Sequence, residues 1–241
     1  MNPPTHAEAV ALAEAIAHST AGSAALCVVC PPTIWLEAVF AAVGDRLEVG
    51  AQTMAAEEGG AFTGETSPLM LAGLARWVIV GHSERRMYSG ETDENVGRKV
   101  ASAVAHAFRP IAAIGERRDE RRAGATEAVI DRQLRAAIAG LRQIQGSGLV
   151  VAYEPVWAIG TGDPASGADA QAAAAQIRAI LREADAASAE DVPILYGGSV
   201  TAANAAEFFA EPDVDGALVG GASLDPAGFS RIVQVAAEMR E

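Results

Sequence analysis

The sequence has 241 residues, a length that fits one α/β barrel or two smaller domains. Hydrophobic residues make up 50% and charged residues 20%, which excludes a disordered or low-complexity chain. The 18 basic and 31 acidic residues leave a net charge of −13. We therefore expect no nucleic-acid partner, because a negative protein repels phosphate backbones at long range.

The predicted elements begin with a helix that Thr5 and Glu8 cap and that ends near residue 18. Short apolar strands then alternate with helices, the pattern of parallel strands covered on both faces. The predicted strands span residues 24–30, 46–51, 76–80, 110–114, 148–153, 192–196 and 215–219. The helices between them are predicted at residues 33–43, 67–74, 93–108, 125–143, 168–185, 201–209 and 226–239.

No linker divides this pattern, so we predict one domain over residues 1–241. A βα unit repeated along the whole chain favours a closed barrel over a doubly wound sheet, and the Gly-x-Gly-x-x-Gly dinucleotide motif is absent. Seven strands are predicted, whereas a (β/α)8 barrel has eight and begins with a strand. The predicted fold is therefore an α/β barrel, of the (β/α)8 type, that lacks its first strand.

The two cysteines, Cys27 and Cys30, form a CxxC pattern within the first apolar run. Residues three apart on a strand point to opposite faces, and no further Cys or Cys/His pair completes a zinc site. We expect core thiols in a reducing compartment. No apolar run approaches the roughly 18 residues that cross a bilayer, and the N-terminus lacks the features of a signal peptide. The expected location is cytoplasmic, without a membrane partner.

A histidine follows the strand predicted at residues 76–80, at the strand end where α/β barrels carry their chemistry. His82 lies in Val-Gly-His-Ser-Glu-Arg-Arg (residues 80–86), at the start of a short helical turn. The positive end of a helix disfavours the imidazolium, and a neutral imidazole can donate a hydrogen bond to a carbonyl oxygen. The alternative is a surface histidine without a role, as we assume for His6, His18 and His106.

A carboxylate closes the strand predicted at residues 148–153. Glu154 leads into an apolar loop, Pro-Val-Trp-Ala-Ile-Gly-Thr. If that loop folds over the site, it excludes water and makes the carboxylate more basic, as a general base near neutral pH requires. A solvated glutamate at a loop entry is the alternative, and position alone leaves the two interpretations even.

Glycine pairs follow the last two predicted strands, in Tyr-Gly-Gly-Ser-Val (196–200) and Leu-Val-Gly-Gly-Ala-Ser (218–223). Glycine lets the backbone approach a ligand closely, and N–H groups at helix starts can hold a phosphate. Phosphate sites after the seventh and eighth strands recur in α/β barrels. The two motifs together predict a phosphate site.

With these motifs the sequence resembles the triosephosphate isomerases, which are TIM barrels. The resemblance rests on residues 61–65 (Ala-Phe-Thr-Gly-Glu), 80–86, 152–162, 196–200 and 214–223, in family order. It implies interconversion of dihydroxyacetone phosphate and glyceraldehyde 3-phosphate, in glycolysis and gluconeogenesis, by proton transfer through an enediolate. It implies a triose phosphate as the substrate and no metal or organic cofactor.

The resemblance also assigns roles to residues. Glu154 would be the base, His82 the electrophile that polarises the carbonyl, and Glu84 a supporting carboxylate. Thr63 would enter the site of a partner subunit in a homodimer. Gly160, Ser199, Gly220 and Gly221 would bind the phosphate. The closing lid would consist of Pro155, Val156, Trp157, Ala158, Ile159, Gly160 and Thr161.

The family's first strand ends in Asn-Trp-Lys-Met-Asn, and its Asn and Lys line the active site. Here Met1-Asn2 resembles the last two residues of that motif, so we expect coding sequence for the first strand upstream of Met1. The single lysine, Lys99, lies in a predicted helix and should face solvent. Two alternatives remain open: an isomerase of a tetrulose phosphate, and a barrel that binds a phosphorylated ligand without catalysis.

Overall fold

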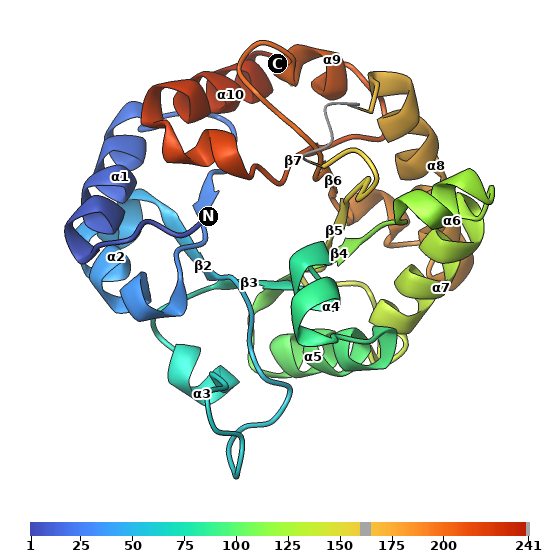
Figure 1. Ribbon diagram of the computed structural model, residues 1–241, viewed down its shortest axis with the longest axis horizontal. Helices are drawn as coiled ribbons and strands as arrows, with labels where there is room; N and C mark the ends of the chain where they lie inside the picture. Colours follow the sequence, from blue (N-terminus) through green and yellow to red (C-terminus); the bar gives the residue numbers. More distant parts are fainter. Residues whose placement is uncertain (160–164, 240–241) are drawn as a thin grey trace.

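Seven parallel strands pair in chain order in the computed structural model, which describes residues 1–159 and 165–239. The strands are β1 (Val28–Val29), β2 (Glu48–Ala51), β3 (Trp77–Val80), β4 (Arg109–Ile114), β5 (Val150–Tyr153), β6 (Ile194–Tyr196) and β7 (Gly216–Ala217). The sheet curls round on itself, with helices outside it (Figure 1). The predicted α/β barrel with seven strands is thus confirmed.

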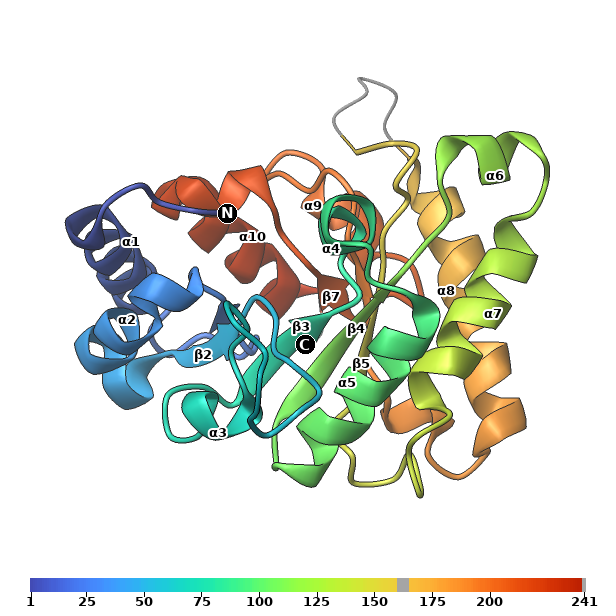
Figure 2. The same ribbon diagram turned by 60° about the horizontal axis from the view of Figure 1, so that its bottom comes forward.

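The helices form an outer layer around the sheet (Figure 2). They are α1 (His6–Ser19), α2 (Leu36–Val43), α3 (Pro68–Leu71), α4 (Ser83–Ser89), α5 (Asp93–Ala105), α6 (Arg118–Arg122), α7 (Thr126–Ile138), α8 (Gly167–Ala184), α9 (Ala205–Phe209) and α10 (Pro226–Glu238). The helix predicted over residues 201–209 begins later, at Ala205, and α6 was not predicted at all. No helix in the described ranges is long and apolar enough to cross a membrane.

Strand residues alternate between two apolar clusters. On β3, Trp77 and Ile79 pack inside the barrel, whereas Val78 and Val80 pack against the helices. The two cysteines follow the same rule: Cys27 packs with the outer cluster and Cys30 with the inner one, both as free thiols. This confirms that they point to opposite faces, because side chains alternate across a strand.

The barrel is open between its two edge strands, β7 and β1. Each pairs with a single neighbour and is two residues long, shorter than the predicted runs 215–219 and 24–30. Both strands are only half-buried, whereas every residue of β3 is buried. Behind the opening, α1 packs against both α2 and α10, so the helix layer continues where the sheet stops. We call the opening between Val28–Val29 and Gly216–Ala217 the slot.

Candidate active site

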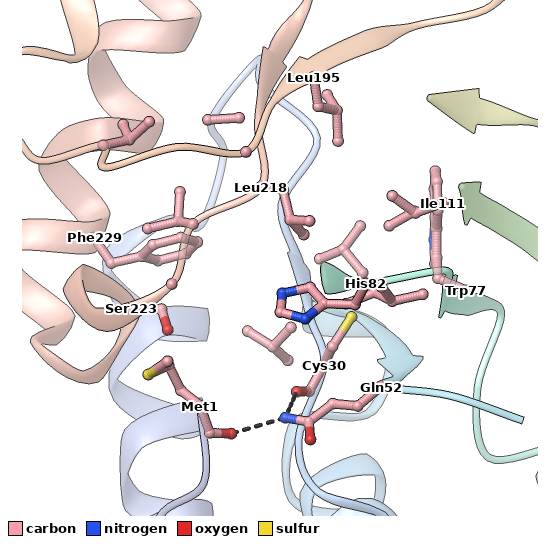
Figure 3. A pocket seen from close by; sticks show the side chains of 18 of the residues that line it. Met1, Cys30, Gln52, Trp77, His82, Ile111, Leu195, Leu218, Ser223 and Phe229 are labelled. Atoms are coloured by element: carbon pink, nitrogen blue, oxygen red, sulfur yellow. Dashed lines mark hydrogen bonds between the residues drawn. The ribbon is translucent and has the colours of Figure 1, made fainter. Parts of the chain in front are cut away.

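The carboxyl ends of the strands surround a cavity of about 1620 Å³ that continues into the slot. Its lining includes His82, Glu84 and Glu154. The glycine motifs also reach it, through Ser199, Gly220 and Gly221. Figure 3 shows His82 near the centre of this space, with Cys30 and Gln52 from the β1 and β2 side and Leu218 and Ser223 from the β7 side. The structure therefore brings together residues that are up to 139 positions apart in sequence, from His82 to Gly221.

Glu154 is held where β5 ends. Its backbone N–H donates to the carbonyl of Ile114 at 2.7 Å, which ties the turn to β4. Its carboxylate is buried, with the residue 2% exposed. The Ser83 backbone N–H donates to Oε2 at 2.9 Å, and the Ser83 hydroxyl donates to Oε1 at 3.3 Å. Two donors from one neighbouring residue thus fix the orientation of the carboxylate.

Burial raises the pKa of Glu154, because a buried carboxylate has lost its hydration. The hydrogen bonds from Ser83 act in the opposite direction but do not cancel this shift. A carboxylate with a raised pKa is a stronger base, and it still accepts a proton readily near neutral pH. The structure therefore supports the buried interpretation of Glu154 over the solvated one.

His82 caps the N-terminus of α4, and this contact determines its tautomer. The backbone N–H of Glu84 donates to Nδ1 at 3.3 Å, so Nδ1 is an acceptor and the ring proton lies on Nε2. Nε2 lies 3.1 Å from Oε1 of Glu154. The ring is thus assigned as neutral imidazole, with its N–H directed at the site.

Glu84 supports His82 through its backbone rather than its side chain. Its carboxylate oxygen lies 3.9 Å from Nδ1 of His82, beyond hydrogen-bonding distance, and the side chain is 67% exposed. At the other side of the cavity mouth, Ser199, Gly220 and Gly221 are exposed, and Gly220 precedes the short 3-10 helix Gly221–Leu224. These three residues are free to meet a ligand that enters from solvent.

The first part of the predicted lid is held by a buried carboxylate. Trp157 Nε1 donates to Oε1 of Glu116 at 2.9 Å, and the Tyr153 hydroxyl donates to both Glu116 oxygens at 3.2 Å. The guanidinium of Arg121 lies 4.6 Å from the Trp157 ring centroid. Pro155 and Ala158 are buried, Val156 is half-buried and Ile159 is exposed. The predicted lid residues Gly160 and Thr161 lie outside the described residues.

The prediction that Lys99 faces solvent is wrong. Lys99 lies on the buried side of α5, and its ammonium forms an ion pair with Glu91 and lies 3.4 Å from the Thr53 hydroxyl. It is buried because Glu91 is fixed inside by the Gly81 N–H, which donates to it at 2.9 Å, and a buried carboxylate needs a counter-charge. Lys99 does not line the cavity.

Sequence reasoning missed two residues that hold the site, Ser83 and Glu116. Ser83 is adjacent to His82, so its contact with Glu154 could have been inferred from the proximity of β3 and β5 ends in a barrel. Glu116 follows β4 in Ile-Gly-Glu, a polar residue at a strand end like Glu154. The positions of Ser83 and Glu116 after strands could therefore have identified both residues from the sequence. Within the described ranges, no three His, Cys, Asp or Glu residues are placed to hold a metal ion.

Comparison with known proteins identifies the family of the chain. The family model described as triosephosphate isomerase matches residues 1–236. A protein named triosephosphate isomerase from Chloroflexus aurantiacus is 52% identical over 209 residues, 86% of this chain and 84% of that protein. One of the same name from Symbiobacterium thermophilum is 51% identical over 216 residues, 88% of this chain and 84% of that protein. The chain therefore belongs to the triosephosphate isomerase family.

Proposed function

We propose that the chain interconverts dihydroxyacetone phosphate and D-glyceraldehyde 3-phosphate, as the names of its relatives indicate. The observation that carries the proposal is the pair of Glu154 and His82. Both side chains line one cavity, and Nε2 of the neutral His82 imidazole lies 3.1 Å from Oε1 of the buried Glu154 carboxylate. This is a base beside a hydrogen-bond donor, the two groups that a proton shift next to a carbonyl requires.

The proposed mechanism assigns one step to each group. Glu154 removes a proton from C1 of dihydroxyacetone phosphate, which gives the enediolate, and returns it to C2. The proton of the C1 hydroxyl passes to the C2 oxygen through Nε2 of His82, so the carbonyl ends at C1. The N–H of His82 Nε2 donates to the substrate oxygen on which negative charge develops. In the unliganded site Nε2 lies 3.1 Å from Oε1 of Glu154, so a substrate oxygen that accepts from Nε2 also lies close to that carboxylate.

For the phosphate we propose Ser199, Gly220 and Gly221, with Gly160 from the lid. The three described residues line the mouth of the cavity and are exposed, which supports the assignment. The lid, residues 155–161, would close over the substrate and exclude water. Trp157 in the first half of the lid donates a hydrogen bond to Glu116, so closure would move the lid residues that follow Trp157.

The test is to incubate the chain with dihydroxyacetone phosphate in D₂O and follow the products by NMR. We expect glyceraldehyde 3-phosphate with deuterium at C2, because the base exchanges its proton with solvent during the reaction. Faster turnover of a tetrulose phosphate would favour that substrate instead. Binding of the unreactive glycerol 3-phosphate without any deuterium incorporation would support a non-catalytic protein and contradict the proposal.

The raised pKa of Glu154 predicts the acid limb of the pH profile. Protonated Glu154 cannot accept the substrate proton, so kcat/KM should fall about tenfold per pH unit below that pKa. Because burial raises the pKa, this fall should begin above the ordinary glutamate value of about 4.3. Measuring kcat/KM from pH 4 to 8 checks the prediction, and a midpoint at the ordinary value would contradict it.

We further propose that the slot takes one more parallel strand, which carries a cation to the site. In the described sheet each edge strand pairs on one side only, and the walls are apolar: Val28 and Val29 line the cavity from β1, and Ala217 and Leu218 line it from the β7 side. Glu84 and Glu154 line the cavity near the carboxyl ends of the strands. Of the two arginines in the lining, among the described residues, Arg85 is on α4 and Arg109 is at the start of β4, the opposite end of the strands. A lysine at the carboxyl end of the added strand would balance the charge of an anionic substrate.

Extending the chain tests this proposal, because Met1 lies at the carboxyl end of the slot, where its carbonyl accepts from Gln52 at 2.8 Å. An extension of about ten apolar residues, with one lysine near its end, should run down the slot. We expect a kcat/KM about 10²–10³-fold above that of the same extension with methionine in place of lysine. Equal activity of the two extended proteins, with equal thermal stability, would contradict a role for the cation.

We propose that the protein is a homodimer in the cytoplasm. Two observations support the dimer: the loop that holds Thr63 projects from the barrel (Figure 1), and apolar side chains beside it are exposed, including Phe62, Leu69 and Met70. The two free thiols are consistent with a reducing compartment. Fractionation of the source cells tests the location.

The dimer predicts a mass of twice 24.7 kDa in light scattering. Thr63→Arg should shift this mass to that of the monomer, because it places a charge where the partner would bury the loop. Ala187→Arg adds the same charge at an exposed position distant in sequence and serves as the control. A single mass of 24.7 kDa for the unsubstituted chain would contradict the proposal.

A further inference from the structure

Gly81 connects β3 to His82, and both of its backbone polar groups are held by charged side chains. Its N–H donates to Oε2 of Glu91 at 2.9 Å, and its carbonyl accepts from Nε of Arg86 at 2.7 Å. Its φ of +75° lies in the left-handed region, and a Cβ there would come within 2.8 Å of the Ala113 carbonyl. The position is therefore restricted to glycine and is fixed from two sides.

Each charged side chain is fixed in turn by an ion pair. Glu91 is paired with Lys99, and their side chains are only 3% and 10% exposed. Arg86 donates through Nη1 to Oδ1 of Asp93 at 2.6 Å, and Arg132 donates to the other Asp93 oxygen at 2.9 Å. Charge-assisted hydrogen bonds of this kind are stronger and more directional than neutral ones.

Arg86 bears most directly on the active site. The Gly81 carbonyl that it holds belongs to the same planar peptide unit as the His82 backbone N–H, so fixing one fixes the other. Its Nη2 also donates to the carbonyl of Ala113 at 3.4 Å, at the end of β4. One guanidinium therefore ties the backbone that leads into His82 to the neighbouring strand.

We propose that Arg86, held by Asp93, is a positioning residue for His82. This inference rests on the proposed isomerase function and adds to it a residue that does not touch substrate. Arg86 sets the peptide plane at His82, and α4 sets the ring through the Glu84 N–H. Together they aim the Nε2–H at the substrate oxygen. A displacement of about 1 Å at such a group is enough to lower the rate by 10²-fold.

The test compares Arg86→Met and Arg86→Lys with the unsubstituted chain. Arg86→Met should lower kcat by about 10²-fold and leave KM nearly unchanged, because no substrate contact is lost. Arg86→Lys should recover part of this loss, since lysine keeps the charge but makes fewer of the bonds. Arg135→Met is the matched control, because Arg135 lies on α7 and its two ion pairs, with Asp131 and with Glu183 on α8, are exposed.

The second readout is the ¹⁵N spectrum of the His82 imidazole, which does not depend on activity. The unsubstituted chain should show a protonated Nε2 and an unprotonated Nδ1, and Arg86→Met should show mixed tautomers. If Arg86→Met does not fold, Asp93→Asn, which weakens the hold on Arg86, should give the same changes to a smaller extent. An unchanged kcat and His82 spectrum in the folded variants would overturn the inference. An unsubstituted chain that keeps this spectrum but does not isomerise would instead refute the proposed function.

Discussion

Replacing Glu154 by glutamine is expected to lower kcat by about 10²–10⁴-fold. Glutamine matches glutamate in size, so the substrate should still bind, but its amide cannot accept the proton from carbon. The kcat and kcat/KM values should therefore fall by similar factors, the result expected when an interaction of the transition state is removed. Steady-state kinetics with dihydroxyacetone phosphate, together with deuterium incorporation from D₂O, measures both.

The matched control for this substitution is Glu183→Gln. Glu183 lies on α8, 65% of its side chain is exposed, and it pairs with Arg135; neither residue lines the cavity. The same change of chemistry should there leave kcat within about twofold of the unsubstituted value, as for a surface site. If Glu154→Gln kept full activity while its circular dichroism spectrum was native, another base would have to be sought.

Gly115→Ala is expected to be the most destabilising of the small substitutions near the site. Gly115 follows β4, and a Cβ there would lie 1.8 Å from the carbonyl oxygen of Glu154. The clash is with backbone, so β4 and β5 would have to separate at the end that carries Glu154. We expect a loss of about 3 kcal/mol of unfolding free energy, or roughly 6–12 °C in Tm, and a loss of activity.

Thermal unfolding followed by circular dichroism measures this effect. Gly59→Ala is the control, because no atom lies within 4 Å of a Cβ built on Gly59. It should leave Tm within about 2 °C. A Tm for Gly115→Ala equal to that of the control would show that the ends of β4 and β5 are less closely packed than described.

Much of the fold follows from local sequence patterns. The strand predicted at residues 110–114 is observed at Arg109–Ile114, and the helix predicted at 168–185 at Gly167–Ala184. The edge strands differ most from prediction, because a strand paired on one side keeps fewer of its residues in the ladder. The helix predicted to begin at residue 201 begins instead at Ala205, as α9. Asn204 precedes it, and its side-chain oxygen accepts a hydrogen bond from the Thr201 N–H at 2.7 Å.

The site residues could be found from sequence because they follow strands. His82, Glu154 and Ser199 each come after an apolar run, and parallel strands in a barrel bring their carboxyl ends together. Arg86 could not be found in this way. It is one of many arginines in the sequence, and its partners Gly81 and Asp93 are identified by direction and distance rather than by residue type.

The sequence by itself determined the seven strands, the (β/α) alternation and the family, because apolar periodicity and the motifs at strand ends are local properties of the chain. Only the tertiary structure decided how charges are buried. It placed Lys99 inside against Glu91, turned Nε2 of His82 toward Glu154 and held Gly81 between two ion pairs. The reason is physical: the cost of burying a charge depends on partners that the fold brings from distant segments, and no local pattern records them.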